Sequence, residues 1–569
     1  MENFVPGITP STGWNTLAGA CLSGVLLHQT FLRRGEWHSS GLSLIFSYSA
    51  LTLALLYFAA TPNFTIYNVT VTPVLVIKAL LCHFVGLVAS LTVYRAVFHP
   101  LRHFPGPLSA RFSNFYRVYL SWNLRVFEET YKLHQQHGDI VRVGKNSTVC
   151  TSMSRPNSTG PNELSLASPE AVKKVHWPQA TPGRGPWYDQ SQPRTSLLTS
   201  RDYNEHARLR KIWDRGFNAK ALRNYSPRVQ AHTARLQDVF EQNLNQTLNL
   251  TQWFNYYSFD VMGDLAFGKS FDMLIGGKDH YFLSVLHHNM KMVGLLGPVY
   301  WVTPILIKTP VLNRQSNRFW EFIGGEVRSR IENPPKSPDV FHWVLEGYGD
   351  ERKTKRGFMN LEAEAELIIV AGSDTTATTL TNSIFELLTH PDHITLLRTE
   401  FSTEIGKDMT SITPDDLVKL PHLNAIINET LRLHPPVPSG VQRKIPPQGI
   451  EIGEVHIPGN TITLIPFYTL FRDERCFEHP HSFIPERWTS KPELNHDSSV
   501  FIPFSHGSFS CVGKQLGLME LRWVLTMMVT QYDISFAPGY DSSGFEKGAM
   551  DGFTMICAPL EVRLSKRMI

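Results

Sequence analysis

Three apolar stretches in the first hundred residues constrain the fold most. Each is close in length to the about 20 residues that a helix needs to cross a bilayer. They run over residues 13–32, 42–61 and 73–94. The second has no charged residue, and the third carries Lys78, which can reach the interface. The sequence therefore predicts a membrane anchor over residues 1–98, with up to three transmembrane helices. A cleaved signal peptide is the alternative for the first stretch, which lacks a basic n-region and a small-residue cleavage site.

Arginines set the expected orientation, because basic residues gather on the cytosolic side of a membrane. They lie between the first two stretches and after the third, whereas the loop 61–72 has none. We therefore expect this loop and the N-terminus in the lumen of the endoplasmic reticulum and the rest of the chain in the cytosol. The loop carries two glycosylation sequons, at Asn63 and Asn68, which agree with a lumenal position.

Composition limits what the rest of the chain can be. Of 569 residues, 42% are apolar and 18% are charged, which excludes a mainly disordered protein. A net charge of +4 is too small to indicate a nucleic-acid partner. Six cysteines without a C-x-x-C pair exclude a disulfide scaffold and a zinc ribbon, so any functional cysteine acts alone.

A stiff hinge, Phe104-Pro105-Gly106-Pro107, leads into a region where helical patterns dominate. Helices are predicted at 357–390, 422–433 and 512–529, and extended runs at 441–445, 454–457 and 461–465. We expect residues 99–569 to form one catalytic domain that is mainly α with small β-sheets.

The segment Lys145–Gly160 is rich in Ser, Thr and Asn and has no hydrophobic period. One interpretation is an insertion in a surface loop. The other is a retained intron, because the segment keeps the reading frame, Gly144-Lys145 can be encoded by a splice-donor sequence, and Pro156-Asn157-Ser158 by a branch sequence. Sequencing the messenger RNA distinguishes the two.

A single cysteine has the most informative surroundings. Cys511 lies between Gly507 and Gly513, immediately before the last predicted helix. Backbone N–H groups at a helix N-terminus stabilise a thiolate, the glycines let the backbone approach a flat ligand, and Phe504 offers an aromatic wall. A thiolate held in this way suits an axial ligand to haem iron. A buried, inert cysteine is the alternative.

Two further patterns bear on the chemistry. Inside a long predicted helix, Asp374 precedes Thr375, and an acid beside an alcohol can relay protons to dioxygen, although an ordinary helix kink is the alternative. Glu429 and Arg432 are three residues apart on another helix, where the alternative is an exposed ion pair. Arg487, in a proline-rich segment, can complete a Glu–Arg–Arg cluster with them.

These motifs, in this order, resemble the cytochrome P450 family, and within it the fungal membrane-bound enzymes. The oxygen-binding helix motif precedes E-x-x-R, P-E-R-W and F-x-x-G-x-x-x-C-x-G. The resemblance covers about residues 100–569 and implies the cytochrome P450 fold, with haem b as the cofactor and Cys511 as its proximal ligand. It also implies that Asp374 and Thr375 are the acid–alcohol pair of proton delivery.

The same resemblance implies roles for other residues. Glu429, Arg432 and Arg487 resemble the structural cluster that holds the haem-binding loop. The other implied contacts to the cofactor are made by His206, Arg210, Arg443, Phe504, Gly507 and Gly513.

The chain departs from the family pattern in two places. Two residues before the cysteine, where the family usually has Arg or His, it has Phe509, whose ring cannot pair with a haem propionate. Either His206, Arg210 and Arg443 carry that charge or His506 helps, and haem affinity or redox potential differs as a result. Three apolar stretches also replace the usual single anchor.

The resemblance implies a monooxygenase that inserts one atom of O₂ into a hydrophobic small molecule, with a fungal secondary metabolite as the expected substrate. Electrons are expected from a separate NADPH-cytochrome reductase, a flavoprotein, because this chain has no flavin or nicotinamide fingerprint. The expected substrate walls are the 285–310 region, Val370–Ala371, Val437–Val441 and Met550–Met555. Two alternatives stay open: a haem-thiolate dehydratase or isomerase, and a non-catalytic haem- or lipid-binding membrane protein.

Overall fold

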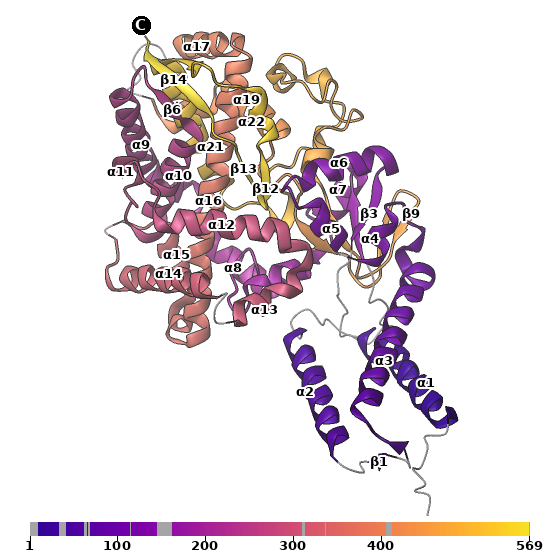
Figure 1. Cartoon of the computed structure of the whole chain (residues 1–569). Helices are drawn as coiled ribbons and strands as arrows, with labels where there is room; N and C mark the ends of the chain where they lie inside the picture. Colours follow the sequence, from indigo (N-terminus) through magenta and orange to yellow (C-terminus); the bar gives the residue numbers. More distant parts are fainter. Residues whose placement is uncertain are drawn as a thin grey trace, which may run out of the picture.

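The computed structural model describes residues 10–33, 41–61, 65–66, 69–113, 115–144, 162–309, 313–335, 337–404 and 412–567. Figure 1 shows a group of N-terminal helices, α1 to α3, beside a larger and mainly helical body. The expected class, mainly α with small β-sheets, is confirmed. The sequon residues Asn63 and Asn68 and the segment Lys145–Gly160 lie outside the described residues.

The N-terminal group consists of α1 (Pro10–Leu26), α2 (Gly41–Ala60) and α3 (Pro73–Val93). Both α1 and α3 continue as short π-helices, to Leu32 and Phe98. Two described helices are long and apolar enough to cross a membrane, over Ser43–Ala60 and Pro73–Phe98. These are the second and third of the predicted stretches, and α1 is not among them.

Small residues let α1 and α3 pack closely against each other. A β-carbon at Gly24 would lie 2.0 Å from the carbonyl oxygen of His83, so only glycine fits there. At the far end of the pair, His28 Nδ1 and Ser90 Oγ form a hydrogen bond of 2.8 Å. Because the late residues of α1 meet the late residues of α3, the two helices run parallel.

The larger body surrounds α16 (Lys355–Thr389), a helix of 35 residues that is buried along most of its length. The helices packed against it are α10 (Leu250–Phe267), α14 (Arg314–Glu332), α15 (Val340–Tyr348), α19 (Pro421–Leu433) and α21 (Lys514–Gln531). The predicted bounds of α16 and α19 agree with the structure within two residues. The last helix begins at Lys514 rather than Val512 because Gly513 takes the N-cap position.

The other helices of the body are all shorter than α16. They are α4 (Leu108–Phe112), α5 (Phe115–Leu120), α6 (Val126–His137), α7 (Pro169–His176), α8 (Tyr203–Gly216), α9 (Ala219–Gln242), α11 (Met273–Gly276), α12 (Tyr281–Leu296), α13 (Thr303–Lys308), α17 (Asp392–Glu404), α18 (Pro414–Val418), α20 (Phe467–Leu470) and α22 (Ser543–Lys547).

The strands form small sheets. The largest has the order β3 (Ile140–Gly144), β4 (Glu163–Leu166), β10 (Ile462–Leu464), β7 (Gln442–Lys444) and β5 (Gly183–Arg184). A second sheet has the order β11 (Tyr532–Phe536), β14 (Glu561–Lys566) and β6 (Thr247–Asn249), and the two-stranded sheets are β12 (Met550–Gly552) with β13 (Thr554–Ile556), β8 (Ile450–Ile452) with β9 (Val455–Ile457), and β1 (Thr65–Ile66) with β2 (Val69–Thr70). The three predicted extended runs correspond to β7, β9 and β10.

Candidate functional site

Cys511 lies on the loop that leads into α21. Its N–H donates to the carbonyl oxygen of Phe504 at 2.8 Å, which closes the loop. Burial raises the pKa of the Cys511 thiol, whereas the backbone N–H groups of Gly513 and Lys514 lower it, as does the charge of Arg210. The residue is nevertheless exposed, so the thiol borders an open space within the surrounding protein. The two N–H groups and Arg210 thus favour the thiolate form that binds a metal, and they partly offset the burial that favours the neutral thiol.

Gly507 shapes the start of this loop. Its φ of +70° lies in the left-handed region, and a β-carbon there would lie 2.7 Å from the carbonyl oxygen of His176. Both facts require glycine at this position, because a side chain would strain the backbone and push the loop away from α7. The glycine therefore fixes how the Cys511 loop sits against the rest of the body.

Two arginines and a histidine surround Phe509. The pairing of β5 with β7 places Arg184 directly opposite Arg443, and their guanidinium carbons lie 4.7 Å and 4.8 Å from the centre of the Phe509 ring. The His206 ring lies 4.6 Å from the same ring. Phe509 thus separates cations that would otherwise repel one another, and it gains cation–π contacts from both arginines.

This cationic cluster has no acidic partner in the described part of the chain. Arg184 and Arg443 form no ion pair there, and the Nε atom of each is buried without a hydrogen bond. Burial, followed by the charges of the neighbouring arginines, lowers the pKa of His206 to about 3. Buried, unpaired cations of this kind need anions, and the two carboxylates of haem fit that requirement.

Arg210 differs from the other predicted cofactor contacts. Its Nη1 donates to the carbonyl oxygen of Ser510 at 2.6 Å, and its Nε donates to Asp214 at 2.7 Å. The side chain therefore supports the loop next to Cys511, and an acidic residue already partners it. His506 is exposed and lines a cavity of about 280 Å³ together with Arg443 and Phe509.

The helix α16 runs unbroken through the Asp374–Thr375 motif. Thr375 Oγ1 donates to the Ala371 carbonyl oxygen at 2.8 Å. Gly372 has a packing role, because a β-carbon there would lie 2.5 Å from Met262 of α10. Ala371 is exposed and Thr375 is half-buried, so this face of α16 borders an open space and not another helix.

Asp374 points to a different set of partners. Its side chain is nearly buried, and its Oδ2 accepts a hydrogen bond from Thr554 of β13 at 3.5 Å. Its Oδ1 lies 3.5 Å from Nε2 of His287 on α12. His287 is partly exposed and lines a small cavity together with Asp374.

Glu429, Arg432 and Arg487 meet in the interior, fully removed from solvent. Arg432 makes two hydrogen bonds to the Glu429 carboxylate, at 2.8 and 2.9 Å, and Arg487 makes one at 3.1 Å. The remaining guanidinium nitrogens donate to backbone carbonyls between Phe471 and Leu494. The cluster therefore ties α19 to the irregular segment before the Cys511 loop.

Sequence reasoning missed Arg184 and His287. Arg184 is the only charged residue in the run Pro182-Gly183-Arg184-Gly185-Pro186. A single cation in a segment stiffened by prolines could have indicated a binding residue. His287 gave no signal, because it lies on an ordinary helix and its relation to Asp374 depends on the packing of α12 near α16.

Comparison with known proteins gives a consistent result. A family model described as "Cytochrome P450" matches residues 118–563. "Cytochrome P450 monooxygenase FCK2" of Fusarium pseudograminearum is 40% identical over 96% of both chains. "Tryprostatin B 6-hydroxylase" of Aspergillus fumigatus is 36% identical over 97% of this chain and 96% of its own. Among solved structures, the "cytochrome P450DA heme domain" has a similar fold, with a TM-score of 0.65 at 16% identity, over 82% of this chain and 98% of its own.

Proposed function

This chain belongs to the cytochrome P450 family, and from that premise we propose that Cys511 is the thiolate ligand of its haem. The chain is a haem-thiolate monooxygenase that oxidises a small molecule. One observation supports the assignment of the ligand. The Cys511 sulfur borders an open space and accepts hydrogen bonds from the backbone N–H groups of Gly513 and Lys514. Haem bound through a thiolate activates O₂ and inserts one of its oxygen atoms into a C–H bond or a double bond.

The cationic cluster around Phe509 supplies the second point of attachment. Arg184 and Arg443 bind the two haem carboxylates, which provide the anions that these cations lack, and the neutral ring of His206 lies beside them. Arg210 acts indirectly, because it holds the Ser510 carbonyl and so positions the neighbouring cysteine. The buried cluster around Glu429 keeps the segment before this loop rigid.

Protons reach the reaction along α16. The Thr375 hydroxyl faces the open space and can present a proton there. Asp374 supplies protons to Thr375, and His287, which lies 3.5 Å from the Asp374 carboxylate, exchanges protons with Asp374. A haem-thiolate isomerase or a binding protein would not need this route, which favours the oxygen-activating function.

The enzyme also needs an electron donor, a location in the cell and a substrate. Electrons come from an NADPH-cytochrome P450 reductase. Residues 1–98 anchor the chain in the endoplasmic reticulum membrane, with residues 99–569 in the cytosol, and the two apolar helices support an anchor. The substrate is a hydrophobic secondary metabolite, which the name of the tryprostatin B hydroxylase supports.

The ligand is tested with the full chain, purified in detergent with haem bound. Dithionite and carbon monoxide should give the Soret band typical of thiolate ligation. Cys511→Ala should abolish this band, whereas Cys476→Ala, which changes a buried cysteine in the core, should keep it. Reductase and NADPH should then give NADPH consumption tied to an oxygenated product.

Two results would contradict the proposal. A thiolate band that survives in Cys511→Ala would show that another residue binds the iron. A normal band without any oxygenated product, tested against a broad set of metabolites, would favour the isomerase or dehydratase.

A further inference from the structure

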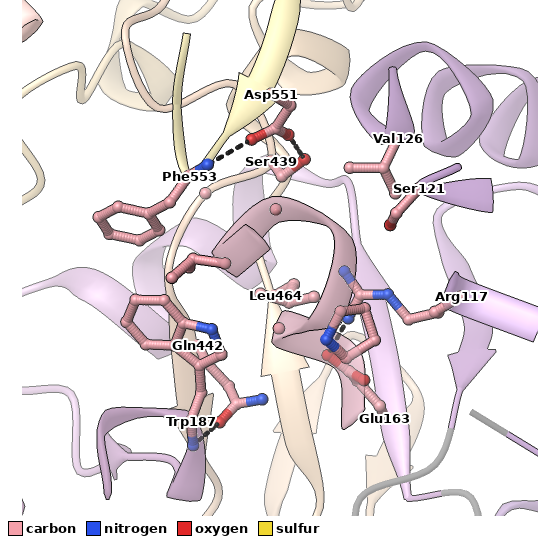
Figure 2. Close-up of a pocket in the computed structure, with 15 residues that line it drawn as sticks. Arg117, Ser121, Val126, Glu163, Trp187, Ser439, Gln442, Leu464, Asp551 and Phe553 are labelled. Atoms are coloured by element: carbon pink, nitrogen blue, oxygen red, sulfur yellow. Dashed lines mark hydrogen bonds and ion pairs between the residues drawn. The ribbon is translucent and has the colours of Figure 1, made fainter. Parts of the chain in front are cut away.

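A pocket separate from the Cys511 loop lies between α5, the end of α12 and the β12–β13 hairpin (Figure 2). Three of the predicted substrate walls meet here, through residues 293–298, 439–442 and 551–553. The cavity volume is about 80 Å³, which holds a small end group and not a whole hydrophobic molecule. A ligand bound here must therefore extend beyond the pocket.

Asp551 places a buried carboxyl group in this pocket. Its side chain is almost fully buried, and its oxygens accept hydrogen bonds from Ser439 Oγ and from the N–H of Phe553 (Figure 2). It forms no ion pair in the described part of the chain. Arg117 is near enough to lower the pKa of Asp551, which burial raises, but its guanidinium pairs with Glu163. A buried carboxylate without a cationic partner is costly, and a cationic ligand relieves that cost.

A second polar group in the pocket also lacks a partner. Ser121 is 1% exposed, and its hydroxyl forms no hydrogen bond with the described residues. It lines the same pocket as Asp551. Buried hydroxyls normally have partners, so this one indicates a polar group of a ligand.

Aromatic rings form the apolar side of the pocket. Trp187 and Phe553 are stacked, with their ring centres 4.7 Å apart. Since the N–H of Phe553 donates to Asp551, the aromatic surface and the carboxylate lie next to each other. This combination favours a cation attached to an apolar body.

The hairpin connects this pocket to the oxygen site. Asp551 on β12 pairs across the hairpin with Met555 on β13, whose carbonyl oxygen accepts a hydrogen bond from Thr378 of α16 at 2.7 Å. On the same strand, Thr554 donates to Asp374. The Asp551 backbone therefore lies about 5 Å, one strand spacing, from the strand that contacts α16.

We propose that Asp551 binds the protonated amine of the substrate, so that the enzyme acts on hydrophobic molecules with a basic nitrogen. This inference rests on the proposed monooxygenase function and adds the substrate class. The amine donates to the Asp551 carboxylate, the aromatic pair covers the adjoining carbon atoms, and the rest of the molecule extends along the hairpin toward Thr375.

The turn of the hairpin offers a structural alternative. Phe553 has a φ of +83°, and the Asp551 carboxylate supports this conformation by accepting the Phe553 N–H. Asp551→Asn separates the two roles, because the amide oxygen still accepts hydrogen bonds while the charge is removed. Asp541→Asn is the matched control, since Asp541 is exposed and makes a similar bond to the Ser543 N–H.

Equilibrium dialysis on the haem-bound full chain tests the proposal with two probes of equal shape. One is N,N-dimethyl-3-phenylpropylamine, which is protonated at neutral pH, and the other is its uncharged carbon isostere, (4-methylpentyl)benzene. The wild type and Asp541→Asn should bind the amine at least about tenfold more tightly, as expected for one buried charge-assisted contact. Asp551→Asn should lose this preference and bind the hydrocarbon as the wild type does.

A wild type without the preference would overturn the proposal, and that measurement needs no variant. A preference that persists in Asp551→Asn would also overturn it, since the amine would then bind elsewhere. The thiolate band with carbon monoxide is recorded on each sample. A missing band with an intact amine preference would instead refute the monooxygenase function and leave the amine site standing.

Discussion

Phe509 stands where the family usually has Arg or His, which can bind a carboxylate. The neighbours of Phe509 explain why a phenyl ring fits there. The ring lies between Arg184 and Arg443, which face each other across two paired strands. Each cation–π contact contributes about 0.5–1 kcal/mol. If Arg184 and Arg443 bind the haem carboxylates as proposed, those cations come from β5 and β7, and Phe509 only needs to keep the two guanidinium groups apart.

Phe509→Arg should therefore weaken the enzyme, although it restores the common family residue. A third guanidinium would repel the other two, and both cation–π contacts would be lost. We expect a loss of about 1–2 kcal/mol in the free energy of unfolding and faster loss of haem, measured by chemical denaturation and by haem transfer to apomyoglobin. Phe509→Tyr keeps the ring and should behave as the wild type. A Phe509→Arg protein that holds haem more tightly would contradict this account.

Thr375→Ala tests the proton route. The hydroxyl is the group on α16 that faces the open space, so its loss should slow protonation and release reduced oxygen as peroxide. Product formed per NADPH should fall by roughly tenfold or more, while NADPH consumption and the thiolate band persist. Thr389→Ala, at the end of the same helix, removes a comparable hydrogen bond and should leave the ratio unchanged. An unchanged ratio in Thr375→Ala would exclude this hydroxyl from the route.

At the scale of elements, a buried acid joins α16 to α19. The Glu386 carboxylate lies 2.6 Å from Nε2 of His434, which caps α19, and 3.3 Å from Nδ1 of His390. Burial alone would raise the pKa of Glu386, but the hydrogen bonds from His390 and His434 lower it to about 2. The hydrogen bond that His390 donates to the Glu386 carboxylate raises the pKa of His390.

This contact gives the enzyme a defined response to pH. The folded pKa of Glu386 is below its unfolded value, so its contribution is present above about pH 4.5 and is lost as the pH falls toward 2. The contribution of His390 has the opposite sign, because it is present below about pH 6.5 and is lost as the pH rises through the folded pKa. Glu386→Gln should lower the free energy of unfolding by on the order of 2 kcal/mol between about pH 4.5 and about pH 6.5. The loss should be smaller at lower and at higher pH, as measured by thermal unfolding across pH. An equal loss at every pH would show that the charge has no part in the contact.

Local patterns predicted the elements whose residues lie close together in the sequence. The helix periodicity placed α16 and α19, and the three-residue spacing of Glu429 and Arg432 placed one ion pair. Arg184 and Asp551 could not be assigned in this way, because each acquires its role from strands far along the chain. Arg184 becomes a neighbour of Phe509 through the pairing of β5 with β7, and the described residues offer Asp551 no ion pair, while Arg117 is paired with Glu163.

At the scale of the whole molecule, the N-terminal helices contact the larger body at a specific place. The helix α13 packs against α2, and the backbone of Trp301, just before α13, approaches Gly41 at the start of α2. The same segment begins at Gly297, which lines the Asp551 pocket. The short segment Gly297–Val302 therefore joins the Asp551 pocket to the N-terminal helices.

The parallel packing of α1 and α3 allows a test of the membrane topology. If α3 crosses from lumen to cytosol, α1 runs in the same direction, and the loop after α2 is lumenal. We expect glycans on Asn63 and Asn68, so that the double variant with Gln at both positions no longer shifts in mass after glycosidase treatment. Asn428→Gln is the control, because its sequon lies in α19 with Thr430 fully buried, and it should leave the shift unchanged. A glycan on Asn428 would place the catalytic domain in the lumen, where a cytosolic reductase could not reach it.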